Sequence, residues 1–430
     1  WRADDGLWRF LAFGMQMCLI LVTGHALASS GPVRRLIAAL ARLPRTGASA
    51  SAMVGLVAAG FGLINWGLGL IVGALLAREV GRSLESRGIR AHYPLLAAAG
   101  YMGLLVWHGG LSGSAPLTMT TRAGAAKVLP GEVLQRFADG VPLSETLLSP
   151  MNLLAAAGAL VLIPLVLWLL TPKDDGDVRT FAAYGVGASE PKGAPRASEG
   201  KESDEGGSPP AHAGRSLGHA PPKTFPDRLH ESPPLAWALG LLFIAAVVRF
   251  GSVDGPGRVG LNEINALMLG LGLLLHGSTA RYVRAVEDGA RGCAGVILQF
   301  PLYAGIMALL VSSGLIDSFS RALAEAGGHS TIPLMTYLSA AAVNMFVPSG
   351  GGQWGIQGPI ALEAGAAAGI SPGKMIMAVA YGDQLTNMLQ PFWALPLLAI
   401  TGVKAREIVG YTCVVMIAVG VWLGALLVLM

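Results

Sequence analysis

One apolar segment carries polar side chains suited to exchanging a proton or holding a small ion. Asp383 is the only acidic residue between Glu363 and Glu407. Because burying an unpaired carboxylate costs several kcal/mol, an acidic residue in such a segment is a candidate for function. On a helix, Asp383 and Asn387 share one face, to which Thr386 also belongs. This arrangement predicts that Asp383 takes part in coupling to a proton or a cation. The alternative is that Asp383 has a structural role, as a helix cap or in an ion pair. Its candidate residues are Asp383, Gln384, Thr386 and Asn387.

A second stretch, Asn344–Pro359, combines five glycines, two prolines, two glutamines and an asparagine. Proline and glycine disfavour a continuous helix, and irregular backbone at membrane depth persists only when it is buried in protein or lines a wet cavity. We therefore expect a re-entrant hairpin whose tip offers N–H, C=O and amide groups to a ligand. The simpler alternative is a glycine-rich loop between two spans. The candidate ligands are Asn344, Ser349, Gly350, Gly351 and Gln353.

The first half of the chain contains a similar pair of interruptions. The apolar segment Ser51–Ala77 is broken at Asn65-Trp66-Gly67-Leu68-Gly69, and Tyr93–Thr121 is broken near His108–Pro116. Asn65 would occupy the place of Asn344, and Trp66 would wall the apolar part of a pocket or anchor at the membrane interface.

Three residues of the His108–Pro116 interruption are further candidates. His108 and Ser112 are four residues apart and share a face if the helix persists there. Histidine titrates near neutral pH, so His108 suits proton coupling or carboxylate binding, although a packing histidine is equally expected. Ser112 and Ser114 are hydroxyl donors at a predicted helix break.

The composition is that of an integral membrane protein. Hydrophobic residues make up 53% of the chain and charged residues 13%, against about 25% charged in ordinary soluble domains. Several apolar runs approach the roughly 20 residues of a helical span. Basic residues lie between these runs, so the net charge of +4 does not indicate nucleic-acid binding. Cys18, Cys293 and Cys413 are widely spaced in apolar runs, which argues against a disulfide framework or a metal site.

The chain divides into two membrane repeats and a linker. Residues 171–233 are rich in Gly, Pro, Ser and charged residues, as in a disordered cytoplasmic linker. Residues 1–170 and 234–430 would form the repeats. Basic loops prefer the cytoplasmic side, which favours a hairpin over a single crossing for Ser51–Ala77. The loops expected inside are Arg34–Arg45, Arg78–Arg90, Arg281–Arg291 and Lys404–Arg406.

Each half thus places a hairpin before a broken span. If the two hairpins enter from opposite sides, the halves are inverted repeats. Paired, interrupted apolar segments at corresponding positions indicate the central site of a transporter. Helix N-termini suit a carboxylate, while exposed carbonyls and helix C-termini suit a cation.

Seven motifs resemble the bacterial short-chain fatty acid transporter family, and the resemblance covers nearly the whole chain except the linker. It implies the ion transporter superfamily, with a scaffold domain, a transport domain of two hairpins and two broken helices, a homodimer and an elevator mechanism. It also implies one more transmembrane helix before Trp1. The motifs are Leu11–Met17, Thr23–Ser30, Ile64–Gly67, Gly110–Ser114, Met345–Pro359, Tyr381–Gln384 and Gln390–Pro396.

The resulting hypothesis is a multi-pass secondary transporter of the bacterial inner membrane, all-α in fold and not an enzyme. It would take up short-chain monocarboxylates such as acetoacetate or butyrate, coupled to H⁺ or Na⁺, and use no cofactor. A sodium ion would bind near Asn65, Ser112, Asn344 and Asn387.

Two alternatives remain open. A dicarboxylate carrier of the same superfamily would need more cationic groups than the breaks provide. An intramembrane serine protease would use Ser112, in Gly110-Leu111-Ser112-Gly113, with His276 as its base.

Overall fold

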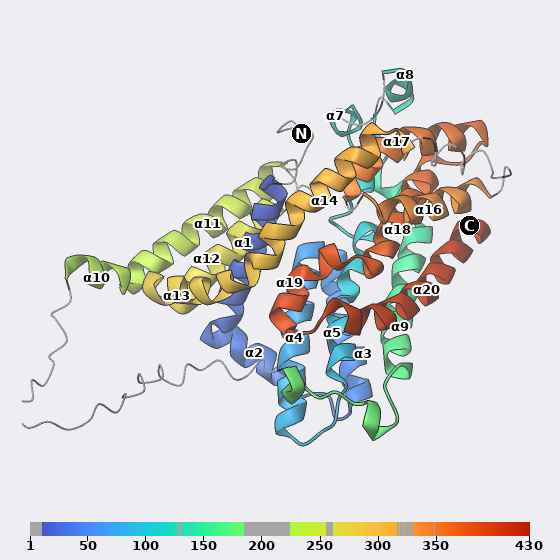
Figure 1. Ribbon diagram of the computed structural model, residues 1–430. Helices are drawn as coiled ribbons and strands as arrows, with labels where there is room; N and C mark the ends of the chain where they lie inside the picture. The colour runs from blue at the N-terminus through green and yellow to red at the C-terminus, as the bar shows by residue number, and fades with distance from the viewer. Residues whose placement is uncertain are drawn as a thin grey trace, which may run out of the picture.

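The computed structural model describes the chain as an assembly of helices (Figure 1). No strand occurs in the described residues. These are residues 11–126, 129, 131–137, 139–184, 224–254, 261–315, 318, 322, 328, 331–347 and 349–430.

The first predicted hairpin consists of two helices, α3 (Gly47–Ile64) and α4 (Trp66–Ser86), which pack side by side. Thr46 begins α3 with a capping box, in which its hydroxyl accepts the Ser49 N–H. Only Asn65 separates the two helices, with extended backbone. The predicted interruption at residues 65–69 is therefore too long. The predicted loop at Arg78–Arg90 also starts too early, because α4 continues through Arg78 and Arg82.

The first broken segment follows directly. It contains α5 (Tyr93–Gly100), 3₁₀ turns at Met102–Leu105 and Trp107–Gly109, and α6 (Ser114–Met119). The α-helix thus ends eight residues before His108, earlier than predicted. Because residues 110–113 are not helical, His108 and Ser112 do not share a helix face, and that prediction is wrong.

The second hairpin consists of α16 (Ile332–Asn344) and α17 (Gly350–Ala367). The prediction of irregular backbone throughout Asn344–Pro359 is wrong, because α17 includes Gly350–Pro359. Ser349 starts this helix by accepting the Gly352 N–H at 3.2 Å. Between the helices, the described residues 345–347 and 349 are non-helical, and Pro348 lies outside the described residues.

The second broken segment runs from α18 (Pro372–Thr386) through a 3₁₀ turn (Asn387–Leu389) to α19 (Pro391–Thr401). The break is shorter than the predicted Tyr381–Pro391, since α18 stays helical to Thr386. Pro391 opens α19, at a position where proline loses no helical hydrogen bond. Both halves therefore contain a helix pair followed by a broken helix; the inverted relation between them stays a prediction.

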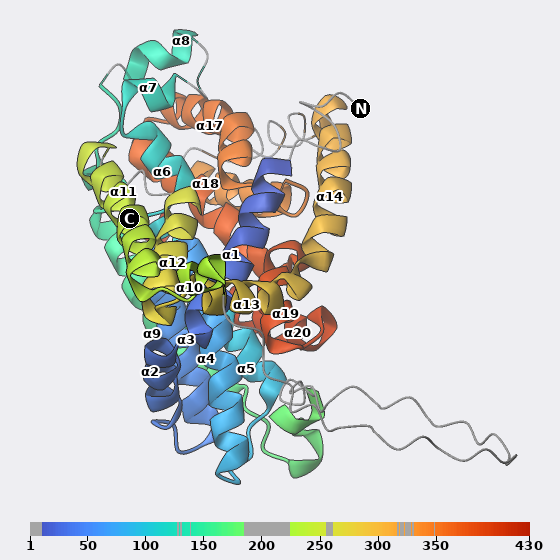
Figure 2. The same cartoon turned by 90° about the vertical axis from the view of Figure 1, so that its left-hand side faces the viewer.

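The remaining helices surround these elements. In Figure 2, α1 lies between α12 and α14 and contacts both. On the other side, α9 packs against α3 and α20. The segment Arg281–Arg291 was predicted as a loop but is mostly α13. The bounds are α1 Leu11–Ser29, α2 Gly31–Ala41, α7 Arg122–Ala125, α8 Gly131–Leu134, α9 Pro150–Leu169, α10 Phe225–His230, α11 Pro233–Asp254, α12 Leu261–His276, α13 Thr279–Ala290, α14 Ala294–Ser312 and α20 Ala405–Leu429.

The predicted linker 171–233 begins with folded structure. Short 3₁₀ helices form at Asp175–Asp177 and Phe181–Tyr184, and the Phe181 side chain is buried against Tyr93. The described residues 171–184 therefore belong to the folded body, which corrects this boundary. Residues 185–223 lie outside the described residues.

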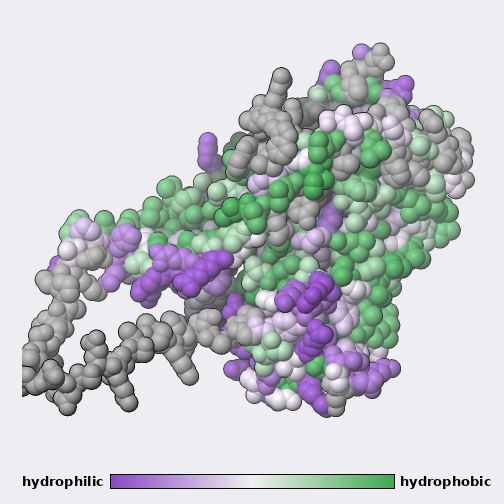
Figure 3. Space-filling view, in the orientation of Figure 1, coloured by the Kyte–Doolittle hydropathy of each residue, from purple (hydrophilic) through white to green (hydrophobic). Residues whose placement is uncertain are grey.

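The surface supports a membrane location. Four described helices, α3, α9, α11 and α20, are long and apolar enough to cross a membrane. Large apolar side chains on them face outward, among them Val161 and Trp168 on α9 and Val421 on α20. Figure 3 shows a broad hydrophobic region above a hydrophilic end at the bottom of the view. Such an outward apolar surface is stable in a bilayer and costly in water.

Candidate functional site

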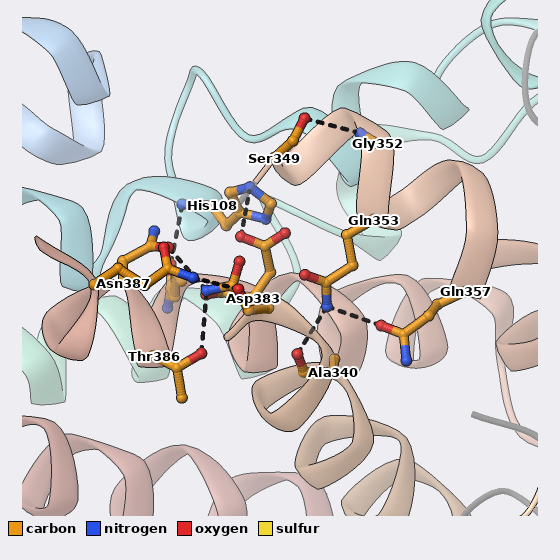
Figure 4. A network of polar contacts seen from close by, with 12 residues as sticks. His108, Ala340, Ser349, Gly352, Gln353, Gln357, Asp383, Thr386 and Asn387 are labelled. Atoms are coloured by element: carbon orange, nitrogen blue, oxygen red, sulfur yellow. Dashed lines mark hydrogen bonds and ion pairs between the residues drawn. The ribbon is translucent and has the colours of Figure 1, made fainter. Parts of the chain in front are cut away.

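Seven predicted site residues meet in one buried cluster, here called the polar centre, and Figure 4 labels His108, Gln353, Asp383, Thr386 and Asn387 among them. They come from the first break, the end of α16, the start of α17, and the end of α18 with the second break. All are at most 8% exposed, so the cluster is closed to solvent. Its members are His108, Asn344, Gln353, Asp383, Gln384, Thr386 and Asn387.

Asn344 links the second hairpin to the second break. Its Nδ2 lies 2.7 Å from the Asp383 carbonyl oxygen, 3.1 Å from Thr386 Oγ1 and 2.9 Å from Asn387 Oδ1. Thr386 in turn donates its hydroxyl to the Ala341 carbonyl, at 2.8 Å. The end of α16 is therefore held against the end of α18, and the Asp383 side chain is left for other partners.

His108 and Asp383 face each other across the polar centre. His108 Nε2 lies 3.7 Å from Asp383 Oδ1, within ion-pair range but beyond a hydrogen bond. The His108 backbone N–H donates to Gln384 Oε1 at 3.0 Å, so the first break is tied to α18. Two titratable side chains are thus held close together without a hydrogen bond between them.

The start of α17 lies beside His108. A Cβ added at Gly350 would come within 2.4 Å of His108 Nε2, so this close approach requires glycine. At Gly351, an added Cβ would meet nothing within 4 Å, and the residue is exposed. The first N–H groups of this 18-residue helix therefore lie near His108, where an anion would be stabilised.

Several buried polar atoms of the polar centre and its neighbours make no hydrogen bond with any described residue. Each such atom costs about 1–3 kcal/mol, so their concentration at one place indicates a ligand site. They include donors, which suit a carboxylate, and acceptors, which suit a proton or cation. These atoms are both ring nitrogens of His108, Trp107 Nε1, Trp354 Nε1, Asn387 Nδ2, Asp383 Oδ2, Asn344 Oδ1, Gln353 Oε1 and Gln390 Oε1.

The candidates near the first hairpin stabilise the N-terminus of α4. Asn65 Oδ1 accepts the N–H groups of Gly67 and Leu68, at 3.0 and 3.2 Å. Ser112 Oγ accepts the Trp66 N–H at 3.0 Å. The proposed sodium ligands thus fall into two sets, Asn65 with Ser112 at this helix start, and Asn344 with Asn387 in the polar centre. Ser114 is the half-buried first residue of α6.

Aromatic rings border the polar centre. The Trp66 ring centroid lies 6.1 Å from that of Trp107 and 5.2 Å from that of Trp393, and Trp107 packs against His108 at 3.7 Å. Trp107 and Trp393 were not among the predicted site residues. Trp393 belongs to the Gln390–Pro396 motif, so the sequence could have indicated it as a site residue.

Asn152 was also missed. Its Nδ2 donates to the carbonyls of Gly109 and Leu147, at 2.9 and 2.7 Å, and its Oδ1 accepts the Tyr381 hydroxyl at 2.9 Å. One residue of α9 therefore connects the first break to α18. Asn152 is the only polar side chain among residues 150–170, and that isolation was the signal.

The protease alternative finds no support in these contacts. Ser112 Oγ accepts a backbone N–H, and His276 Nε2 lies 2.8 Å from the Ala26 carbonyl oxygen. Each candidate catalytic group is thus engaged with backbone in a different part of the described structure.

Together these features define a helical membrane protein with a closed polar site between two helix breaks. The short-chain fatty acid transporter family model matches residues 1–430, and the chain belongs to this family. A relative from Escherichia coli K12, provisionally named a short-chain fatty acid transporter, is 39% identical over 97% of this chain and 86% of its own length. A relative from Haemophilus influenzae with the same provisional name is 34% identical over 95% of this chain and 84% of its own. Family and relatives confirm the predicted resemblance and the non-enzymatic role.

Two solved structures are also similar. The YdaH transporter of Alcanivorax borkumensis has a TM-score of 0.42 at 15% identity, over 97% of this chain and 86% of that one. Neisseria gonorrhoeae MtrF, described with antimetabolite efflux pumps, has a TM-score of 0.39 at 18% identity, over 99% and 84%.

Proposed function

We propose that this protein is a multi-pass secondary transporter that takes up short-chain monocarboxylates, such as acetoacetate or butyrate, across the bacterial inner membrane. The observation that carries the proposal is the buried Asp383–His108 pair beside the N-terminus of α17. It combines a group that can bind a proton or cation with donors for a carboxylate.

The substrate carboxylate would bind at the start of α17. The N–H groups of Gly350 and Gly351 offer partial positive charge, and His108 adds a side-chain donor. No Lys or Arg occurs among the buried side chains of the described residues, which favours one carboxylate over two. Trp66, Trp107 and Trp393 offer an apolar surface for the tail. At about 0.8 kcal/mol per buried CH₂, selectivity among short chains would be broad.

Coupling would occur at Asp383. An uncompensated negative charge in this buried position is costly, so Asp383 would carry a proton or bind a cation during transport. His108 and Asp383 together suit a proton. The unpaired oxygens of Asn344 and Gln353 equally suit Na⁺.

Movement is required because the polar centre is closed. A substrate can reach it only if elements around it separate, as in alternating access. We propose that α16–α18 belong to a moving transport domain with an elevator-type motion, in a homodimer built from inverted repeats. The resemblance of the sequence to the ion transporter superfamily supports this mechanism.

The experiment is uptake of labelled butyrate into proteoliposomes, with a proton gradient or a sodium gradient imposed separately. The variant is Asp383→Asn, and the matched control is Glu363→Gln, an exposed acidic residue on α17. We expect Asp383→Asn to lower gradient-driven uptake by at least about tenfold, through loss of the coupling group, and Glu363→Gln to stay within twofold of wild type.

Each outcome decides a different point. Uptake driven only by protons and lost in Asp383→Asn assigns proton coupling to Asp383. Uptake driven by sodium assigns sodium coupling instead. Absence of butyrate uptake by the wild type under either gradient would contradict the proposed substrate.

A further inference from the structure

A cavity of about 170 Å³ lies beside the second helix break, outside the polar centre. The break and α19 form one side of it, and the first turns of α20 form the other. Drug-sized ligands occupy pockets of about 300–1,000 Å³, so this cavity suits a smaller molecule. Its lining includes Tyr101, Met388, Gln390, Ala394, Arg406 and Ile408.

The cavity is apolar with one cation. Met388, Ala394 and Ile408 are buried wall residues. The exposed Arg406 makes no hydrogen bond or ion pair with the described residues. The neighbouring carboxylate, Glu407, is already engaged, because its Oε1 lies 2.9 Å from Arg179 Nη1 and 3.0 Å from the Tyr184 hydroxyl. An apolar cavity with an unpaired guanidinium matches a small molecule with one carboxylate and a short apolar tail.

The floor of the cavity touches the polar centre through Gln390. Its Nε2 donates to the Asn344 carbonyl, while its buried Oε1 has no hydrogen-bond partner in the described part of the chain. The Tyr101 hydroxyl lies 2.9 Å from the Asn387 carbonyl oxygen and 3.1 Å from the Gln390 carbonyl oxygen, so it holds the backbone of the break in place. The Gln390 side chain therefore connects the lining of the cavity to Asn344 of the polar centre.

We propose that this cavity is a second, release-side binding site for the short-chain monocarboxylate, with its carboxylate on Arg406 and its tail against Met388, Ala394 and Ile408. The inference rests on the proposed function. Lys404 and Arg406 are predicted on the cytoplasmic side, so the site would receive substrate that leaves the polar centre past Gln390. It would also be the first site met by cytoplasmic substrate.

The test is butyrate transport in right-side-out and inside-out membrane vesicles. Arg406→Gln removes the charge of a residue that has no hydrogen-bond or ion-pair partner among the described residues. Its matched control is Lys404→Gln, the neighbouring exposed cation, which does not line the cavity. We expect Arg406→Gln to raise the butyrate KM about tenfold in inside-out vesicles and less than twofold in right-side-out vesicles. We expect Lys404→Gln to change neither value.

A second variant tests the apolar wall. Val409 lines the edge of the cavity and is 40% exposed, so Val409→Phe would narrow the cavity without overpacking the core. The control is Val414→Phe on the same helix, at a residue 44% exposed that does not line the cavity. In inside-out vesicles, Val409→Phe is expected to raise the KM of hexanoate more than that of acetate, whereas Val414→Phe is expected to raise neither.

The outcomes separate this inference from the proposed function. Absence of butyrate transport by the wild type in both orientations would contradict the proposed function itself. If the wild type transports butyrate but Arg406→Gln behaves as Lys404→Gln, the release-side site is wrong. An Arg406→Gln effect that is equal in both orientations, or that disappears when anionic lipids are removed, would also overturn it, since Arg406 would then act on the whole cycle or on lipid headgroups.

Discussion

At the scale of single residues, Asn65 and Asn344 were predicted to occupy corresponding positions, but their side chains make different contacts. Asn65 uses its side-chain oxygen to hold the N–H groups that begin α4. Asn344 uses its side-chain nitrogen to join α16 to the second break, and its oxygen stays unpaired in the polar centre. The same residue type therefore has a local capping contact in one half and long-range contacts in the other.

The glycines that open α17 allow a sharp test of the proposed carboxylate site. A methyl group at Gly350 would press on His108 and on the Trp107 ring, 2.4 and 2.9 Å away, whereas Gly351 has open space. We expect Gly350→Ala to reduce butyrate uptake by about tenfold or more, because displacement of His108 by even 1 Å disturbs the site. The measurement is initial uptake in proteoliposomes.

Gly351→Ala is the control for that prediction. It makes a similar backbone change one residue away and keeps the N–H group, so uptake within about twofold of wild type is expected. Equal losses in both variants would show that helix propensity at this position, and not contact with His108, controls activity.

At the scale of elements, the two hairpins share their order in the chain but differ at their tips. The first turns at one residue, Asn65, while the second has residues 345–349 between its helices. The first break is further fixed by the Leu111 N–H, which donates to the Leu63 carbonyl at 2.7 Å. Outside the hairpins, Asn152 of α9 supplies a further connection between the first break and α18.

Asn152→Ala would remove that connection. The carbonyls of Gly109 and Leu147 and the Tyr381 hydroxyl would each lose a partner in a buried place, at roughly 1–3 kcal/mol for each unsatisfied group. We expect a lower Tm in detergent, measured by tryptophan fluorescence, and a smaller decrease for Tyr381→Phe, which breaks only one of the three contacts.

The matched control is Leu153→Ala, at the adjacent α9 residue, which is 54% exposed and should leave these contacts intact. If Asn152 and Tyr381 stabilise the protein through their contact, the effects of the two single substitutions on stability should not be additive. If the double variant Asn152→Ala/Tyr381→Phe is destabilised by the sum of the single effects, the two side chains are not coupled and the bridge has no energetic role.

At the scale of the whole molecule, the segment after α9 joins elements far apart in the chain. Arg179 forms an ion pair with Glu407 of α20 and its backbone carbonyl accepts the Tyr93 N–H at 2.8 Å. The backbone N–H of Arg179 donates to His92 Nδ1 at 3.2 Å, and His92 Nε2 lies 3.0 Å from the Tyr411 hydroxyl. The segment after α9 thus contacts the start of α5 and the first turns of α20.

This arrangement predicts a dependence of stability on pH. Burial, and then the charge of Arg179, lower the pKa of His92 below its usual value near 6.5. Below about pH 6.5, His92 therefore binds a proton more readily in the unfolded chain than in the folded protein. The contribution of His92 to the free energy of unfolding is fully present above about pH 6.5. It decreases as the pH falls from about 6.5 to the lowered pKa of the folded protein.

The measurement is Tm between pH 5 and 8 for the wild type, for His92→Gln and for His230→Gln, an exposed histidine used as control. We expect a decrease of Tm below pH 6.5 in the wild type and in His230→Gln, and a smaller decrease in His92→Gln. Parallel curves for all three proteins would assign the acid sensitivity to other groups.

The sequence by itself determined the class of protein and the neighbourhood of the site. Apolar runs of near-spanning length, the basic segments between them and isolated polar residues such as Asp383 are local properties, and local properties can be read along the chain. The breaks near Asn65, His108, Asn344 and Asn387 were confirmed in place. Their lengths were not. In the second hairpin, for example, Gly350–Pro359 is helical, with Ser349 as the N-cap of α17.

Only the tertiary structure decided which groups meet. His108 and Asp383 are 275 positions apart, and their contact depends on how the first break packs against α18, which no local pattern specifies. The packing of distant segments also explains why Asn65 and Ser112 lie in one place and Asn344 and Asn387 in another. It explains the contacts of Asn152 in the same way. Buried polar side chains find partners by packing of distant helices, so their pairing is a property of the assembled bundle.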